Sequence, residues 1–382
     1  MPWKEVCALG LKNEMINDWL TKEYSITDLS NSYGVSRKTL YKWIERFRLY
    51  GLDGLEELPR EPLSHPDATP VEIVEEILAL KRQKMKWGPR KIIAKLKNDH
   101  PGISWPADST GNKILKKYGL VYPRKFRSHI PPYTKPFLEC FQPNAVWSAD
   151  YKGQFRMGNN QKCYPLTISD NYSRYLLGCW GLSRPTYEQT KPYFELAFIN
   201  NGLPDAIRTD NGQPFASRGL GGLSRLSVWF IKLGIKPERI DPGCPEQNGR
   251  HERMHRTLKD FTASPPKSNL EKQQEAFIFF IKEYNEERPH EALRQNPPAS
   301  VYRPSPRPYP VKLRKVEYDS NMVARYVTNR GCIKWRGELI FLSESLCGEY
   351  VALKQVDSHR WEIRFSSYLL GFFDEETKKV IK

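Results

Sequence analysis

Three acidic residues lie at places where carboxylates from distant parts of the chain can meet. Asp150 lies on an apolar stretch that predicts a β-strand over 145–155, and Asp210 ends a second predicted strand, just before an Asn-Gly pair. Glu246 falls in the first turn of a long predicted helix. Carboxylate oxygens are hard ligands of the kind that Mg²⁺ takes. Two divalent ions about 3.5–4 Å apart activate an attacking oxygen and neutralise a leaving oxygen at a phosphodiester.

Two of these acids also have a purely structural interpretation. Asp210 can start an Asx turn, and Glu246 can simply favour a helix N-terminus. Both roles are compatible with metal binding, and neither accounts for Asp150 as well. We therefore expect the three carboxylates to act together as metal ligands.

The predicted elements around these acids are three antiparallel strands followed by alternating helices and strands. Apolar alternation predicts strands over 163–170 and 174–181, after the strand that carries Asp150. The next predicted elements are a helix over 186–202, a strand over 206–210, a helix over 223–234 and a strand over 236–240. This order is compatible with an RNase H-like mixed sheet, and the expected fold class is a multidomain α/β protein.

Residues 1–60 predict a helix-turn-helix. Ser25 and Asp28 have the spacing of a capping box, and Ser36 is a good N-cap for a basic helix. In such a layout the second helix enters the major groove of DNA. The alternative is a solvated basic helix in an ordinary three-helix bundle. The basic residues outside the apolar stripe of that helix are the expected DNA contacts: Arg37, Lys38, Lys42 and Arg46.

Residues 68–122 repeat this layout and carry most of the excess charge. The chain has 60 Lys and Arg against 44 Asp and Glu, a formal charge of +16. Residues 71–127 hold 14 basic and 5 acidic residues, so a net +9 lies in this segment. Lysines on a helix are often only a solvated face, but this density predicts a second, winged-helix-like DNA-binding module. Its candidate DNA contacts are Arg90, Lys91 and Lys113.

The rest of the sequence limits the class of protein and its compartment. The longest purely apolar run, 276–281, is far shorter than the roughly 20 residues of a membrane span, so we expect no membrane partner. Seven dispersed cysteines form no Cys-x-x-Cys pair, which is typical of reduced thiols in a cytoplasmic protein. Proline-rich composition predicts a linker over 123–142 and a semi-rigid spacer over 295–310. Short strands over 311–374 predict a small β-barrel.

Three short motifs around the acids carry a resemblance to a known family. They are Trp-Ser-Ala-Asp-Tyr (147–151), Arg-Thr-Asp-Asn-Gly-Gln-Pro-Phe (208–215) and Cys-Pro-Glu-Gln-Asn-Gly-Arg (244–250). They resemble the Asp-Asp-Glu signature of the integrase-core superfamily, with 35 residues between the second and third acid. With the helix-turn-helix modules, a core over 143–300 and the C-terminal strands, nearly the whole chain resembles a bacterial insertion-sequence transposase with a retroviral-integrase-like core.

The resemblance implies an activity, a metal and partners. A transposase of this kind binds the terminal inverted repeats, cleaves the element ends and joins the 3′-hydroxyl to target DNA with Mg²⁺, for which Mn²⁺ can substitute. Asp150 would bridge two ions, and Asp210 and Glu246 would each complete one. Arg250 and Arg253, on the helix of Glu246, would hold DNA. The partners would be double-stranded transposon-end and target DNA and further copies of the chain, as a homodimer or higher oligomer in a synaptic complex, in the bacterial cytoplasm at the nucleoid.

Two other functions share parts of this pattern. A non-catalytic DNA-binding regulator would keep the modules without the chemistry, and an RNase H-type nuclease would keep the chemistry without needing two sequence-reading modules. The retroviral relatives carry a zinc-binding His-His-Cys-Cys module, whose spacing does not occur before the core here, so no structural zinc is expected.

Several motifs compete with this interpretation. Residues 251–255 fit His-Glu-x-x-His, the zinc metalloprotease motif. We attribute this match to chance, because a protease has no use for two helix-turn-helix modules. We expect the two histidines to reach DNA or to pack in the protein. Asp170 is expected to cap a turn instead of binding metal. His290 is expected to pin the end of the last core helix, and Trp335 and Arg336 are candidates for DNA contact.

Overall fold

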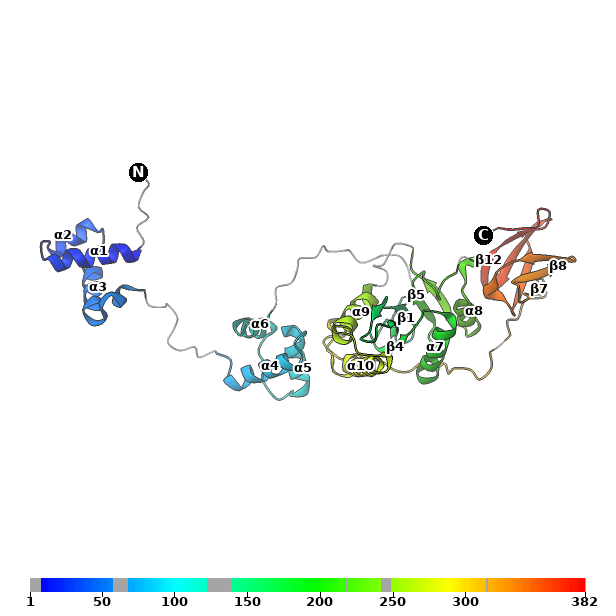
Figure 1. Ribbon diagram of the computed structural model, residues 1–382, viewed down its shortest axis with the longest axis horizontal. Helices are drawn as coiled ribbons and strands as arrows, with labels where there is room; N and C mark the ends of the chain where they lie inside the picture. Colours follow the sequence, from blue (N-terminus) through cyan, green and yellow to red (C-terminus); the bar gives the residue numbers. More distant parts are fainter. Residues whose placement is uncertain are drawn as a thin grey trace. The chain divides into compact units, whose positions relative to one another are not determined.

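The computed structural model describes residues 8–57, 68–121, 139–217, 219–241, 249–313 and 315–381. The chain forms two compact units, Met1–Thr69 and Pro70–Lys382 (Figure 1). Among the described residues, no helix has both the length and the apolar character needed to cross a bilayer.

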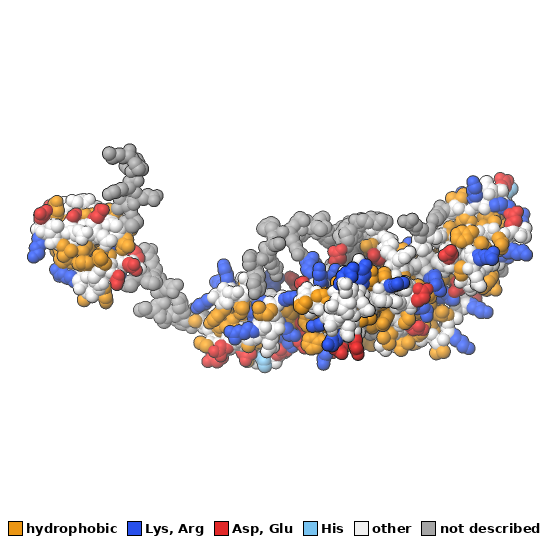
Figure 2. Space-filling model, viewed as in Figure 1, with side chains coloured by type: hydrophobic (Ala, Val, Ile, Leu, Met, Phe, Trp, Pro, Cys, Tyr) orange, Lys and Arg blue, Asp and Glu red, His pale blue; other side chains and the backbone are white. Residues whose placement is uncertain are grey.

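The first unit is a three-helix bundle whose caps agree with the sequence. Its elements are α1 (Ala8–Thr21), α2 (Ile26–Ser32), α3 (Arg37–Tyr50) and the 3₁₀ turn η1 (Gly51–Leu55). Ser25 and Asp28 form the predicted capping box, and Ser36 Oγ accepts from the Thr39 amide at 3.2 Å. The apolar stripe of α3 is buried against α1 and α2, so its basic residues face outward, and Figure 2 shows Lys and Arg side chains on this unit's visible face.

The second unit begins with the three predicted helices of the second module. They are α4 (Val71–Gln83), α5 (Pro89–Asp99) and α6 (Asp108–Lys117). Pro89 opens α5, where its missing N–H costs no hydrogen bond. Ile77, Trp87 and Ile92 belong to the buried cluster that these helices share.

A six-stranded mixed sheet forms the core, and its pairing confirms the predicted order. Its strands are β1 (Val146–Tyr151), β2 (Phe155–Arg156), β3 (Lys162–Asp170), β4 (Leu176–Leu182), β5 (Ala206–Thr209) and β6 (Lys236–Arg239). β3 pairs antiparallel with β1, β2 and β4, whereas β1, β5 and β6 run parallel. β1 is therefore the strand at which the antiparallel and parallel halves meet.

Helices cover both faces of this sheet (Figure 1). They are α7 (Tyr187–Asn201), α8 (Arg225–Lys232), α9 (Gly249–Thr262) and α10 (Leu270–Lys282). Trp147 and Ala149 pack with aromatic residues of α7 and α8, whereas Met254 of α9 and Phe277 of α10 belong to a separate cluster with Cys163. Because side chains alternate along a strand, Ser148 and Asp150 point to the α9 face.

The proline-rich segment 295–310 packs on the core, so the predicted spacer is wrong. The Tyr302 ring stacks on Tyr175 with centroids 4.2 Å apart, and its hydroxyl donates to Asn144 Oδ1 at 3.1 Å. The Tyr309 hydroxyl donates to Glu195 Oε1 at 2.6 Å, and the Leu203 amide donates to the Arg307 carbonyl at 2.7 Å. Proline content predicted an extended backbone, but the aromatic and arginine side chains between the prolines fix it to the core.

The C-terminal strands form two sheets, so the predicted closed β-barrel is not confirmed. The strands are β7 (Val323–Tyr326), β8 (Cys332–Trp335), β9 (Glu338–Phe341), β10 (Tyr350–Gln355), β11 (Arg360–Phe365), β12 (Tyr368–Asp374) and β13 (Lys379–Ile381). Five of them pair in the order β13-β12-β11-β10-β7, and β8 pairs with β9 in a separate hairpin. Because that hairpin does not join β13 to β7 in the described part of the chain, the strands do not close on themselves.

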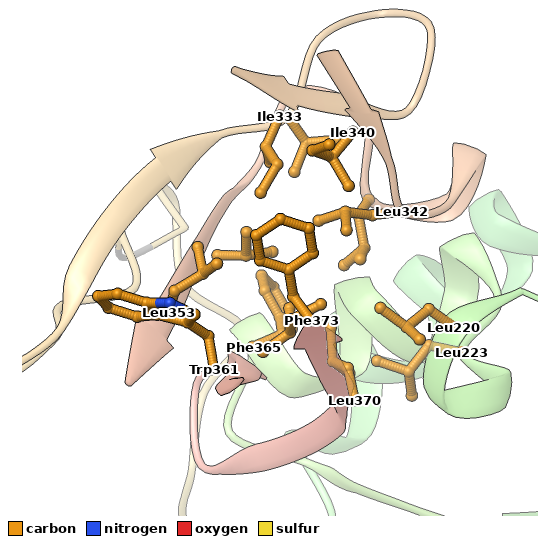
Figure 3. Packing of buried hydrophobic residues seen from close by; sticks show 14 of the residues in the cluster. Leu220, Leu223, Ile333, Ile340, Leu342, Leu353, Trp361, Phe365, Leu370 and Phe373 are labelled. Atoms are coloured by element: carbon orange, nitrogen blue, oxygen red, sulfur yellow. The ribbon is translucent and has the colours of Figure 1, made fainter. Parts of the chain in front are cut away.

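The C-terminal strands share one hydrophobic cluster with the core. Leu220 and Leu223, which follow the Asp210 loop, pack with Leu370 and Phe373 (Figure 3). Trp335 is buried in the same cluster and donates to Glu375 Oε1 at 3.0 Å, so this candidate DNA contact is wrong.

Candidate metal centre

Asp150 lies at the end of β1 with its side chain turned toward α9. The side chain is 19% exposed. Burial and the nearby charge of Asp210 raise the pKa of this carboxyl to about 7, partly offset by the Tyr151 amide and the Lys152 ammonium. Ionisation of this carboxyl is unfavourable in these surroundings, so a bound cation would stabilise its charged form.

Asp210 follows β5, the parallel neighbour of β1, and one of its oxygens has no hydrogen-bond partner in the part of the chain that the structure describes. Its Oδ1 is buried without a hydrogen-bond partner among the described residues, and burial raises the pKa of the carboxyl. The Gly212 amide opposes that rise, as in the Asx turn that Asp-Asn-Gly predicted. A Cβ on Gly212 would stand 2.9 Å from Asp210 Oδ2, so a larger residue here would displace the carboxylate. Two acids on adjacent strands with an unsatisfied buried oxygen fit a divalent cation.

Glu246, the third predicted ligand, lies outside the described residues, as does the side chain of Arg250. Helix α9 begins at Gly249 within the described chain, three residues beyond Glu246. Arg253, the other candidate DNA contact on this helix, is exposed. The part that Glu246 plays in metal binding stays a prediction.

Both histidines of the His-Glu-x-x-His motif are buried between α9 and β3. Thr167 Oγ1 lies 2.7 Å from His251 Nε2 and 2.6 Å from His255 Nε2, and Ser169 Oγ lies 3.1 Å from His251 Nδ1. His255 Nδ1 lies 3.8 Å from Asp150 Oδ2. Burial lowers the pKa of His251 to about 3 and that of His255 further, so both rings are neutral. The expectation that these residues pack is confirmed, and their ligand atoms lie within 4.8 Å of Asp150 and each other.

Asp170, three residues along β3 from Thr167, makes the turn predicted for it. Its Oδ1 accepts from the Asn144 amide at 2.8 Å, and its Oδ2 accepts from the Ser173 amide at 2.8 Å and the Ser173 hydroxyl at 2.6 Å. These donors oppose the effect of burial, which raises its pKa. Asp170 therefore closes the turn between β3 and β4 without a cation.

The candidate DNA contacts of the first module face outward. Arg37, Lys38 and Lys42 are exposed on α3. Arg46 is only partly exposed, because its guanidinium stacks on Trp43 and donates to the Glu56 carbonyl at 2.7 Å.

The candidates of the second module differ from one another. Lys113 is exposed, whereas Arg90 donates to Glu291 Oε1 at 3.1 Å. Burial and the charge of Arg288 lower the pKa of Lys91 to about 7. His290 is partly buried, and its ring centroid lies 4.8 Å from that of Tyr284, in agreement with a pinning role. Arg336 is exposed and pairs with Glu375 at 2.8 Å, and its contact with DNA stays a prediction.

The sequence interpretation missed the polar residues of β3 that meet the histidines. Thr167 and Ser169 lie more than eighty residues before His251, and nothing local marks them as its partners. The available signal was alternation: both fall on the same face of β3 as Cys163, opposite Leu166 and Ile168.

Comparison with known families agrees with this architecture. Two models, each described as an integrase core domain, match residues 141–245 and 233–298. A helix-turn-helix domain matches residues 12–62, and a homeodomain-like domain matches residues 39–115. The chain thus carries an integrase core domain together with helix-turn-helix domains.

The relatives are proteins of mobile elements. The chain is 24% identical over 228 residues to an uncharacterised 39.2 kDa protein of insertion element IS476 from Xanthomonas euvesicatoria, covering 58% of this chain and 62% of that protein. It is 23% identical over 274 residues to the transposase of transposon Tn552 from Staphylococcus aureus, covering 65% and 54%. The chain thus spans less than two thirds of the length of these relatives. The matches confirm the resemblance to insertion-sequence transposases with an integrase core.

Solved integrases are similar to this chain at low identity. The HTLV-2 integrase catalytic core domain in complex with magnesium is 18% identical and covers 43% of this chain and all of that one, with a TM-score of 0.35. A chain of a simian T-cell lymphotropic virus intasome is 17% identical and covers 77% and 97%, with a TM-score of 0.38.

Proposed function

We propose that the protein is a DNA transposase that binds the terminal inverted repeats of its element, cleaves the element ends and joins the 3′-hydroxyl to target DNA. The observation that carries this proposal is the pair Asp150 and Asp210 on adjacent parallel strands, with a buried Asp210 oxygen that has no partner among the described residues. The pair lies in a core that matches an integrase core domain, and a divalent metal between the two acids would satisfy that oxygen.

The residues that would hold the metal are Asp150, Asp210 and Glu246. When bound, Mg²⁺ or Mn²⁺ supplies activation of the attacking oxygen and neutralisation of the leaving oxygen. The parallel pairing of β1 with β5 brings the two aspartates to one edge of the sheet. Gly212 keeps the loop backbone close to Asp210, and exposed Arg253 on α9 offers a charge for a DNA phosphate.

Recognition of the element ends falls to the helix-turn-helix modules. The exposed basic residues of α3 supply phosphate contacts and, from its N-terminal turn, base contacts. Such binding weakens steeply with salt, because each neutralised phosphate releases counterions. Two ends must be cut and joined together, so we propose that a homodimer or higher oligomer holds them.

The test replaces Asp210 by Asn and follows nicking of a labelled duplex that contains the element end, in Mg²⁺. We expect the nicking rate to fall by about 10³-fold or more, since the amide removes a metal-binding charge without changing shape. Asp205→Asn is the matched control, because Asp205 lies just before β5 and pairs with Arg307 at 3.0 Å, away from the pair of acids. Nicking by Asp210→Asn at the wild-type rate would overturn the assignment.

The same assay separates the alternatives. End binding by the wild-type protein without any nicking in Mg²⁺ or Mn²⁺ would favour a regulator. Cleavage without joined products, on substrates unrelated to the element ends, would favour an RNase H-type nuclease. Strand-transfer products that depend on the element end support the transposase.

A further inference from the structure

His255 presents a ring nitrogen to the carboxylate of Asp150. The distance of 3.8 Å between its Nδ1 and Asp150 Oδ2 is too long for a hydrogen bond. Two ligand atoms about 2.1 Å from one ion lie roughly 3.0 Å apart at right angles and about 4.2 Å apart when opposite. The observed separation falls between these limits, so one ion can contact both atoms.

The hydrogen bonds of Thr167 determine which ring nitrogen of each histidine carries the proton. Thr167 Oγ1 has one proton, which it donates to the Asp150 carbonyl at 3.0 Å. Its lone pairs then accept from Nε2 of His251 at 2.7 Å and from Nε2 of His255 at 2.6 Å. Each neutral ring therefore carries its proton on Nε2 and a lone pair on Nδ1.

The two Nδ1 lone pairs differ in what they meet. That of His251 accepts from the Ser169 hydroxyl at 3.1 Å. That of His255 faces Asp150 Oδ2, itself an acceptor, and no donor among the described residues reaches it within hydrogen-bond distance. Two acceptors that face each other across this gap are stabilised by a cation between them.

We propose that His255 Nδ1 is a ligand of the same divalent ion as Asp150, and that this nitrogen makes the ion site prefer Mn²⁺ to Mg²⁺. The inference rests on the proposed function for the assignment of Asp150 to a metal. Imidazole nitrogen suits transition metals, whereas Mg²⁺ takes oxygen ligands and water.

This ligand set also explains the His-Glu-x-x-His motif without a zinc protease. A protease site uses both histidines as ligands and the glutamate as base. Here His251 has both ring nitrogens in hydrogen bonds, Glu252 is exposed, and only His255 has a nitrogen left for an ion. The one-turn spacing places both rings on β3, where Thr167 fixes their tautomers.

The experiment detects the nitrogen directly. Full-length protein is loaded with Mn²⁺ alone, and pulsed EPR measures nuclear modulation from nitrogen bonded to the ion. We expect a nitrogen signal in the wild type, and we expect it to change from ¹⁴N to ¹⁵N character when only histidine is ¹⁵N-labelled. This readout needs neither a substitution nor catalytic activity.

Two glutamine variants assign the signal to one ring. In His255→Gln the side-chain amide nitrogen replaces Nε2 beside Thr167 and nothing replaces Nδ1. We expect the nitrogen signal to disappear and the affinity for Mn²⁺ to fall by about tenfold or more, at least the effect of removing an outer partner of a ligand. His251→Gln is the matched control and should keep the signal. Circular dichroism shows whether each variant is folded.

The outcomes for this inference and for the proposed function are distinct. If Mn²⁺ binds to the wild type and not to Asp150→Asn, but the wild type gives no nitrogen signal, the assignment of His255 as a ligand is overturned. The transposase proposal is not affected by that result. A signal that survives in folded His255→Gln, or a wild type that binds no Mn²⁺, also overturns the assignment of His255. Failure of the proposed function is read separately, as absence of end nicking by the wild type.

Discussion

Asp150, which is partly buried, and Asp170, which is fully buried, lie on neighbouring strands of one sheet, and their surroundings are opposite. Asp170 accepts three hydrogen bonds from Asn144 and Ser173. Asp150 faces the second acid Asp210 and a histidine lone pair, and its pKa rises to about 7. An acid that the protein itself satisfies is structural, whereas one placed against other acceptors is stabilised by a proton or by a cation from outside.

The largest expected effect of this contrast is on DNA cleavage. If the proposed function holds, Asp150→Asn should lower the rate of end nicking by about 10³-fold, because a proposed metal-binding carboxylate becomes a neutral amide. Asp170→Asn, compared at a temperature where both variants are folded, should stay within about tenfold of the wild type. Nicking rates at saturating Mg²⁺ measure both, and equal losses would remove the functional distinction between the two acids.

The next largest effect is on the stability of the metal-free protein. The difference in stability between the wild type and Asp150→Asn depends on pH. The pKa of Asp150 in the folded chain, about 7, exceeds the ordinary value of 3.8, so ionisation disfavours the folded state. The wild type should therefore lose stability relative to Asp150→Asn as pH rises from about 4 to about 7, by on the order of 3 kcal/mol. Urea unfolding in a chelator measures the difference, which should be absent at pH 4.

Adding metal should have a related effect on stability. Added Mn²⁺ should stabilise the wild type at pH 8 and should stabilise Asp150→Asn much less, because the amide at position 150 offers no negative charge to the ion. A difference in stability that does not vary with pH would contradict the assignment of the raised pKa to Asp150.

Asp170 should respond in the opposite direction and by a smaller amount. Asp170→Asn places an amide donor against the donors of Asn144 and Ser173, which should lower the free energy of unfolding by about 2 kcal/mol at pH 7. Ser173→Ala, which removes the hydroxyl that donates to Asp170 and accepts from the Tyr175 amide, should cost about 1 kcal/mol. Thermal unfolding measures both. If Asp170→Asn were more stable than the wild type, Asp170 would resemble Asp150 in being unfavourable when ionised, and the contrast between the two acids would be wrong.

The smallest effect extends the contrast between partnered and unpartnered charge to the basic residues. Lys38 is exposed and forms no ion pair in the part of the chain that the structure describes, whereas Arg90 pairs with Glu291. Lys38→Ala should weaken binding to end DNA by about 1 kcal/mol and lower the salt slope by about one, and Arg90→Ala should do less. Fluorescence anisotropy at several salt concentrations measures both, and a larger loss for Arg90→Ala would reverse this order.

Local patterns predicted most helices of the first unit and most of the core fold. The order of strands and helices follows from alternation and from caps such as Ser25 and Ser36, which act within a few residues. The division of the C-terminal strands into two sheets and the docking of 295–310 depend on contacts between distant residues, such as Tyr302 with Asn144. Local patterns do not contain that information.

The candidate site likewise combines features that the sequence predicted with contacts that only the fold reveals. The resemblance identified Asp150 and Asp210, and the sheet brings them to adjacent strands. The spacing of His251 and His255 predicts a shared helix face, but only the pairing of β1 with β3 shows that this face meets Thr167 and Asp150. Motif spacing alone suggested zinc, and the surrounding hydrogen bonds change that interpretation.

The hydrophobic cluster shared by the core and the C-terminal strands has a consequence for synthesis of the chain. Leu220 and Leu223 follow the loop of Asp210, yet they are buried by Leu370 and Phe373 (Figure 3). A ribosome makes the covering strands about 150 residues later. A nascent chain therefore leaves that apolar segment open to water until those strands emerge, and a chain released before them would expose it to proteases and to aggregation.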